Sequence, residues 1–185
     1  KEAHPLLETR PVKKIALIVF TTDKGLCGGL NTNIFKKAIE TVGSEKNSSL
    51  YPVIDVVAIG KKGNAFFKKL KLNLVASFIE LGDRSNIRDV AAISKIALDD
   101  FLEKKYDKVV LVYANFVSTL SQVPQAKQIL PLTKEMIQSI AEFKPIEMEQ
   151  EESRAKTFDF EYLLEPNASA LLSALLPKLV EMQIY

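Results

Sequence analysis

Hydrophobic positions follow two alternating patterns along the first two thirds of the chain. Apolar runs rich in β-branched residues cover residues 15–20, 53–59 and 109–114, with a shorter run at 74–78. The run at 15–20 is unbroken, whereas Asp55 interrupts the run at 53–59. Such runs are typical of strands buried on both faces. Between them, apolar residues recur at helical spacing over 34–42, 61–70 and 87–105, which predicts helices with one apolar side.

Asn31 or Thr32 is expected to cap the first helix and Gly43 to end it. We expect the second helix to bury Ala65, Phe67 and Leu70, and Leu102 of the third to face the sheet.

Alternating strands and helices predict an α/β fold. We expect a mostly parallel, Rossmann-like sheet with right-handed crossovers and helices on both faces. The pattern changes after about residue 121, where Pro124 and Pro131 allow at best an edge strand or an extended arm over 121–132. Residues 136–160 show no sustained period, and the acidic segment 147–156 is interpreted as a solvated loop.

A last helix is predicted from Glu165-Pro166-Asn167 onward, with a stripe of leucines and a kink caused by Pro177. The apolar pattern reaches Tyr185 without a stop signal, so we expect the helix to continue in a longer chain. The expected organisation is an α/β globular domain over 1–160 and the start of a C-terminal coiled-coil helix over 161–185.

Composition narrows the class of protein. The 185 residues are 47% hydrophobic and 26% charged, as expected for a globular domain. No apolar run approaches the about 20 residues that cross a bilayer. The net charge of +2 and the absence of Trp argue against a nucleic-acid partner. The single cysteine, Cys27, excludes an internal disulfide framework and suits a reducing compartment.

A glycine-rich turn over residues 22–33 joins the first predicted strand to the first predicted helix, a position where α/β proteins often bind phosphate. A P-loop needs a lysine after its last glycine, but Leu30 and Asn31 follow Gly29. The spacing of Gly25, Gly28 and Gly29 also differs from the dinucleotide fingerprint. Glycines in such a turn have a structural explanation, because they allow positive φ and close backbone approach.

The sequence also lacks the residue combinations that nucleophilic catalysis and zinc binding need. His4 lies in the N-terminal tail, so Cys27 has no general base nearby, and no Cys/His cluster suits zinc. We therefore expect no catalytic, cofactor-binding or metal-binding residue. One alternative stays open, a free-standing α/β domain that binds a nucleotide or phosphate. The residues available to such a site are Asp23, Gly25, Gly28 and Lys61.

Four segments in order resemble the γ subunit of F-type ATP synthases, of bacterial type. The turn TDKGLCGGLN at 22–31 resembles the signature Ser/Thr-Asp-Arg/Lys-Gly-Leu-Cys-Gly-Gly-Leu-Asn. Similar matches are IGKKG at 59–63, FVSTLSQVP at 116–124 with LPL at 130–132, and YLLEP at 162–166. The sequence departs from the family at Leu164, often aromatic there, and at Pro177. By this resemblance we expect the chain to correspond to the globular part of the subunit, without the family's long N-terminal helix and most of its C-terminal helix.

The resemblance implies a non-catalytic central rotor that couples proton-driven rotation of the c-ring to ATP synthesis in the catalytic hexamer. Its implied partners are the α, β and ε subunits and the c-ring, through which it would be peripheral to the cytoplasmic face of a bacterial inner membrane. A structural adaptor unrelated to ATP synthase is the third possibility. The implied contacts with the lever loops of β are Lys24, Gly25, Leu26, Cys27, Gly28 and Gly29. The implied contacts with the c-ring are Tyr162, Leu163, Leu164 and Glu165.

Overall fold

The computed structural model describes residues 5–25, 28–79, 87–118, 120–133 and 135–136. The predicted last helix and its boundary at residue 161 lie outside these ranges. None of the helices in the described ranges is both long and apolar enough to span a bilayer. In chain order the elements are η1 (Pro5–Leu7), β1 (Lys14–Phe20), α1 (Leu30–Lys46), β2 (Val53–Ile59), α2 (Lys61–Lys69), β3 (Asn73–Phe78), α3 (Ile87–Leu102), β4 (Lys108–Ser118) and β5 (Ser121–Leu130).

The described strands form one sheet in the order β3-β2-β1-β4-β5. β1 pairs in parallel with β2 and β4, and β2 pairs in parallel with β3. β5 is antiparallel to β4 and lies at the edge of the described sheet, where Pro124 opposite Ala114 is tolerated. The predicted mostly parallel α/β fold is confirmed, and the segment predicted as an edge strand or arm is an edge strand.

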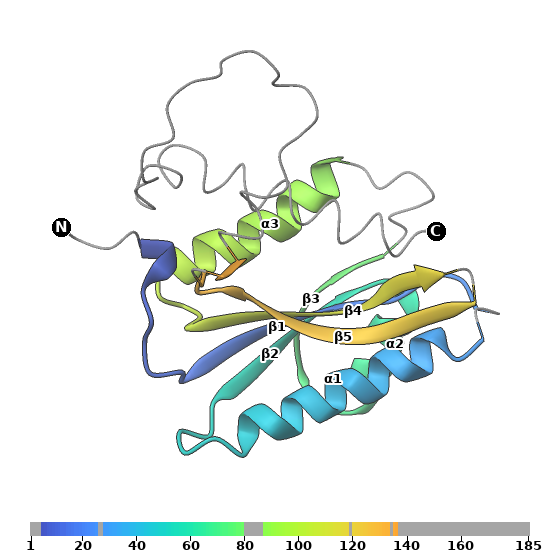
Figure 1. The fold of residues 1–185 in the computed structure, drawn as a ribbon, viewed down its shortest axis with the longest axis horizontal. Helices are drawn as coiled ribbons and strands as arrows, with labels where there is room; N and C mark the ends of the chain where they lie inside the picture. The colour runs from blue at the N-terminus through green and yellow to red at the C-terminus, as the bar shows by residue number, and fades with distance from the viewer. Residues whose placement is uncertain (1–4, 26–27, 80–86, 119, 134, 137–185) are drawn as a thin grey trace, which may run out of the picture.

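Helices cover both faces of the sheet, as predicted (Figure 1). α1 and α2 lie on one face and α3 on the other. β1 lies in the middle, and its residues 15–20 are each at most 2% exposed. Because successive side chains of a strand point to opposite faces, β1 contributes to both cores. Ile15, Leu17 and Val19 pack toward α1 and α2, whereas Ala16, Ile18 and Phe20 pack toward α3.

The helices differ from the sequence prediction at their ends. α1 continues past Gly43 to Lys46. α3 ends at Leu102, which is 46% exposed rather than facing the sheet. Lys104 then takes a positive φ of 61°, which turns the chain out of the helical path toward β4.

The buried side of α2 also differs from the prediction. Phe67 is fully buried as expected, but Ala65 is exposed and Leu70 is 43% exposed. Gly63 takes their place against the sheet. The short helix therefore contacts the sheet through a glycine and one aromatic ring.

A polar cluster ties the amino-terminal ends of the strands together. The carboxylate of Asp55 in β2 is 1% exposed and is the sole buried charged or polar residue in the described ranges. It accepts hydrogen bonds from the Tyr106 hydroxyl at 2.9 Å and from the Asn73 amide at the start of β3. The ammonium group of Lys14 lies 3.2 Å from the same carboxylate. Buried carboxylates need such partners because desolvation is costly.

We expect Tyr106→Phe to lower the free energy of unfolding by about 1–3 kcal/mol, because Asp55 loses a buried donor. Urea denaturation measures this change. Tyr51→Phe is the matched control, since Tyr51 is 78% exposed, and it should change stability by less than about 0.5 kcal/mol. Equal effects of the two substitutions would contradict a stabilising role for the cluster.

The stability of the protein at alkaline pH should also depend on this cluster. Burial raises the pKa of the Tyr106 hydroxyl, and the hydrogen bond to Asp55 and the charges of Asp55 and Asp100 raise it further. Burial also raises the pKa of Tyr113. The unfolded chain releases these protons near pH 10, whereas the folded chain keeps them. This contribution to stability is therefore complete below about pH 10 and falls at higher pH, by up to about 1.4 kcal/mol per pH unit for each group.

Denaturation of the wild-type chain and of Tyr106→Phe at about pH 9 and about pH 11 measures this difference. The variant should lose less stability over that interval. Parallel losses in the two proteins would show that Tyr106 ionises equally readily when folded.

Candidate functional site

The carboxyl ends of β1 and β4 mark the place where the topology reverses. From β1 the chain steps outward to β2 and β3, and then returns through α3 to β4 on the other side of β1. Open α/β sheets bind ligands at such a switch point. The glycine turn that follows β1 therefore lies where a nucleotide would be expected.

Thr21, the first residue after β1, closes the gap between β1 and α2. Its hydroxyl donates to the carbonyl of Ile59 at 2.7 Å and accepts from the backbone N–H of Gly63 at 2.8 Å. Its own N–H donates to the same carbonyl of Ile59 at 2.8 Å. Thr21 thus joins the end of β2 to the first turn of α2.

The next two residues complete the cap of α2. The carbonyl of Thr22 accepts from the N–H of Lys62 at 3.2 Å. The carboxylate of Asp23 accepts from the N–H of Lys61 at 2.9 Å. Free N–H groups at the start of a helix are what binds a phosphate. In α2 the first three of these groups are already paired with residues at the exit of β1.

Two glycines make this close approach possible. A Cβ atom at Gly60 would lie 2.3 Å from the carbonyl oxygen of Thr21, and Gly60 also has a φ of +94°. A Cβ atom at Gly63 would lie 2.7 Å from the hydroxyl oxygen of Thr21. The spacing of glycines in IGKKG therefore has a steric cause, which is the contact between α2 and the β1 exit.

Asn31 has a role different from a helix cap. Gly29 is the N-cap residue of α1 and makes no side-chain cap hydrogen bond. The amide of Asn31 donates to the Thr22 hydroxyl at 2.8 Å, and its oxygen accepts from the Thr22 N–H at 3.2 Å. The Thr22 hydroxyl in turn donates to the carbonyl of Lys24 at 2.6 Å. Asn31 therefore holds the start of α1 against the turn.

The structure places the described residues of the turn together at the carboxyl edge. Lys24, Gly25, Gly28 and Gly29 are exposed there. Gly28 has a φ of +59°, and a Cβ atom at this position would meet no other atom within 4 Å. The backbone conformation, rather than a lack of space, therefore favours glycine here. Of the other expected contacts, Leu26, Cys27, Tyr162, Leu163, Leu164 and Glu165 lie outside the described residues.

The geometry bears directly on the alternative phosphate site. Asp23 and Lys61 do meet at the start of α2, but through the carboxylate of Asp23 on the backbone N–H of Lys61. A carboxylate at that position would repel a phosphate and already occupies its donor. Within the described ranges, no group of three or more His, Cys, Asp or Glu side chains could hold a metal ion. Sequence reasoning located the turn but missed Thr21 and Asn31 as its connecting residues.

Comparisons with known proteins agree with the motif order. The family model described as ATP synthase matches residues 1–185. The chain is 35% identical to the ATP synthase gamma chain of Legionella pneumophila (strain Corby), covering 98% of this chain and 58% of that protein. It is 38% identical to the gamma chain of Dehalococcoides mccartyi (strain ATCC BAA-2100 / JCM 16839 / KCTC 5957 / BAV1), covering 98% and 56%. The chain thus spans a little over half the length of these curated relatives.

Solved structures share the fold. The central stalk and c-ring structure of the Tetrahymena thermophila mitochondrial ATP synthase contains a chain with a TM-score of 0.55 and 23% identity, covering 96% of this chain and 75% of that chain. The rotor of the Euglena gracilis mitochondrial ATP synthase in rotational state 1 gives a TM-score of 0.58 at 17% identity, covering 97% and 68%.

The family match extends over the whole sequence, and described residues at the start of the glycine turn that carries the resemblance are hydrogen-bonded to α1 and α2. The chain therefore belongs to the family of ATP synthase gamma chains.

Proposed function

We propose that this chain is the globular part of the central rotor of an F-type ATP synthase. The subunit is non-catalytic and couples proton-driven rotation of the c-ring to ATP synthesis in the catalytic hexamer. Its relatives are gamma chains, and the Tetrahymena structure that shares the fold is a central stalk with a c-ring. The proposed partners are the α, β and ε subunits and the c-ring. The chain would be peripheral to the cytoplasmic face of a bacterial inner membrane.

The observation that carries this proposal is the paired set of donors at the start of α2. The three N–H groups that a phosphate would use are hydrogen-bonded to Thr21, Thr22 and Asp23. The same bonds fix α2 to the end of β1, so the turn supports a stiff body. A rotor needs such stiffness because close-packed interiors transmit strain.

The proposed contact with the lever loops of β uses the exposed part of the turn. Lys24, Gly25, Gly28 and Gly29 project at the carboxyl edge, and Leu26 and Cys27 connect them in the sequence. Three of the four described residues have no side chain, so a partner loop could approach the backbone closely.

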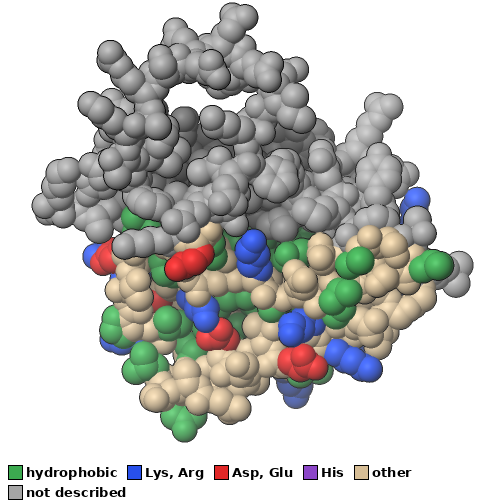
Figure 2. Space-filling model, in the orientation of Figure 1, with side chains coloured by type: hydrophobic (Ala, Val, Ile, Leu, Met, Phe, Trp, Pro, Cys, Tyr) green, Lys and Arg blue, Asp and Glu red, His purple; other side chains and the backbone are tan. Residues whose placement is uncertain are grey.

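Surface charge also supports protein partners. Figure 2 shows lysine and arginine side chains interspersed with acidic ones over the described part of one face. With a net charge of +2, the chain lacks the strongly basic balance of nucleic-acid-binding domains.

We expect isothermal titration of the chain with ATP-Mg to show no heat of binding, because the donors at the turn are already paired. The isolated catalytic β subunit, titrated in the same buffer, is the positive control. A dissociation constant below about 100 μM, or about −5.5 kcal/mol, would favour the alternative of a nucleotide-binding domain.

A second prediction concerns the proposed contact of Tyr162, Leu163, Leu164 and Glu165 with the c-ring. In the intact enzyme, Glu165→Lys should reduce proton pumping while ATP hydrolysis by the catalytic hexamer continues, because the new lysine would repel basic groups of the ring loops. If Glu165 only favours the start of the following helix, the substitution should cost about 1 kcal/mol of stability with coupling intact.

Proton pumping and ATP hydrolysis are measured on the same membranes. Glu165→Gln is the matched control, since it removes the charge without reversing it and should have a smaller effect. Normal pumping by an assembled enzyme that carries Glu165→Lys would exclude the c-ring contact at this residue.

A further inference from the structure

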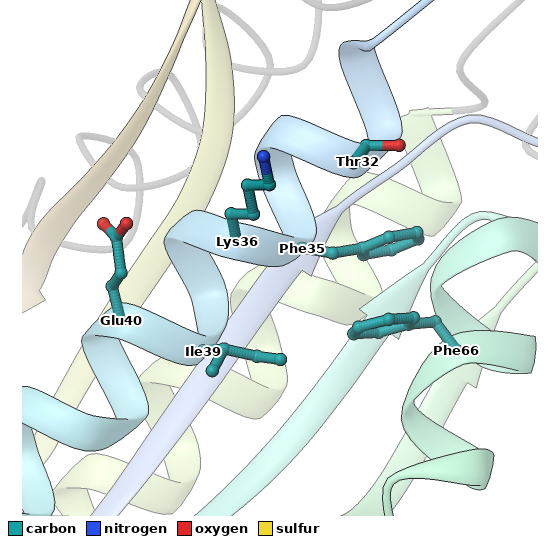
Figure 3. A pocket seen from close by; sticks show the side chains of 6 residues that line it. All are labelled: Thr32, Phe35, Lys36, Ile39, Glu40 and Phe66. Carbon is teal, nitrogen blue, oxygen red and sulfur yellow. The ribbon is translucent and has the colours of Figure 1, made fainter.

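A groove runs along the outer side of α1 beside α2, beginning at Thr32 near the end of the glycine turn. It encloses about 440 Å³. Its lining comes from one side of α1, at positions three or four residues apart, and from one ring of α2 (Figure 3). The lining residues are Thr32, Phe35, Lys36, Ile39, Glu40 and Phe66.

The floor of the groove is apolar and rigid. The rings of Phe35 and Phe66 stack with centroids 3.9 Å apart and planes 5° from parallel. Both rings also contact Phe67 edge-on, with centroid distances to the Phe67 ring of 6.1 Å for Phe35 and 5.2 Å for Phe66. Phe67 is fully buried in the core, so it fixes the position of the stack. Ile39 extends this floor along α1 and is 44% exposed.

The helix on one side of the groove is basic. α2 has the sequence KKGNAFFKK, with four lysines and no acid. Lys62 and Lys69 lie four residues before and three residues after Phe66 on α2 and flank the groove without lining it; the ammonium group of Lys62 lies beside Gly25 of the glycine turn. Lys36 lines the groove on the α1 side. Within the part of the chain that the structure describes, none of these three lysines forms an ion pair.

The lining contains a single acidic residue, and it is already engaged. Glu40 lies 3.9 Å from the ammonium group of Lys37 on the same helix. The groove therefore combines a half-buried aromatic floor with Lys36 on the α1 side and the lysine-rich helix α2 on the other.

We propose that this groove docks an acidic amphipathic helix of a partner protein. The apolar side of that helix would lie on Phe35, Ile39 and Phe66, and its carboxylates would face the lysines. From Thr32 to Glu40 the groove is about 12 Å long, which matches about two turns of an incoming helix. Helix-in-groove recognition uses this combination of apolar anchors and flanking charges.

Two other occupants match the surface less well. A second copy of this chain, docked groove to groove, would bring lysines against lysines, which is costly. A lipid surface needs a broad set of apolar side chains that project outward, whereas of the three apolar side chains here Ile39 alone is exposed.

Fluorescence polarisation on the full chain tests the chemistry of the groove. The probe is a labelled helical peptide of about 18 residues, with leucine at helical spacing and glutamate on both sides of the stripe. The comparison peptide carries lysine in place of every glutamate. The acidic peptide should bind with a micromolar dissociation constant and at least about tenfold more tightly than the basic one. Its binding should weaken when salt is raised from about 0.05 M to about 0.5 M.

Two substitutions test whether the acidic peptide binds in the groove. Ile39→Glu should weaken binding of the acidic peptide at least about tenfold, since it adds a carboxylate to the floor. Leu50→Glu is the control, because Leu50 is 52% exposed and lies outside the groove, and binding should be unchanged. Equal binding of the acidic and basic peptides, or equal loss in the two variants, would overturn the proposal.

Photo-cross-linking in the assembled complex tests the class of partner. The photoreactive residue p-benzoylphenylalanine replaces Lys36, or Leu50 as the control, in cells that make the protein. The expected product from position 36 joins this chain to an acidic amphipathic helix of another protein, and mass spectrometry identifies the joined peptide. Products with lipid, with nucleic acid or with a second copy of this chain, or no product beyond that of the control, would overturn the proposal.

Discussion

The backbone N–H groups at the start of α2 need acceptors, and residues at the exit of β1 supply them. Thr21, Thr22 and Asp23 each accept one of these hydrogen bonds. The pairing requires α2 to approach the strand so closely that glycine is needed at positions 60 and 63. It also fixes Thr22, which holds Asn31 and hence the start of α1. The positions of both helices on this face of the sheet therefore depend on one short segment after β1.

The amino-terminal ends of the strands, on the side of the sheet opposite the glycine turn, are joined by a polar cluster. Asp55 joins the beginnings of β1, β2 and β3 and the residue Tyr106 before β4 through a buried carboxylate. Hydrophobic packing fills the space between the two edges on both faces. A body connected at both ends of its strands resists shear between them, which is the mechanical property that the proposed rotor function needs.

Much of the fold could be predicted from the sequence, because the apolar runs reflect burial on both faces of a parallel sheet. The runs at 15–20 and 53–59 correspond closely to β1 and β2. Helix details were wrong where a distant partner decides the outcome. Asn31 binds Thr22 instead of capping its own helix, and Gly63 instead of Leu70 contacts the sheet. The glycine turn was predicted between the first strand and the first helix, but its paired donors involve residues 38 to 42 positions apart, which local spacing cannot reveal.

The paired donors at the start of α2 also constrain how this turn could change during evolution. Conversion to a phosphate site would require loss of the Asp23 carboxylate and of the Thr21 hydroxyl. Loss of the Thr21 hydroxyl would leave the part-buried N–H of Gly63 without its acceptor, at a cost of about 1–3 kcal/mol. The exposed N–H of Lys61 would bind water after loss of the Asp23 carboxylate. An intermediate sequence would therefore be less stable until a ligand occupied the place. Descendants of this chain are thus more readily selected for new contacts on the outside of the turn than for a new ligand within it.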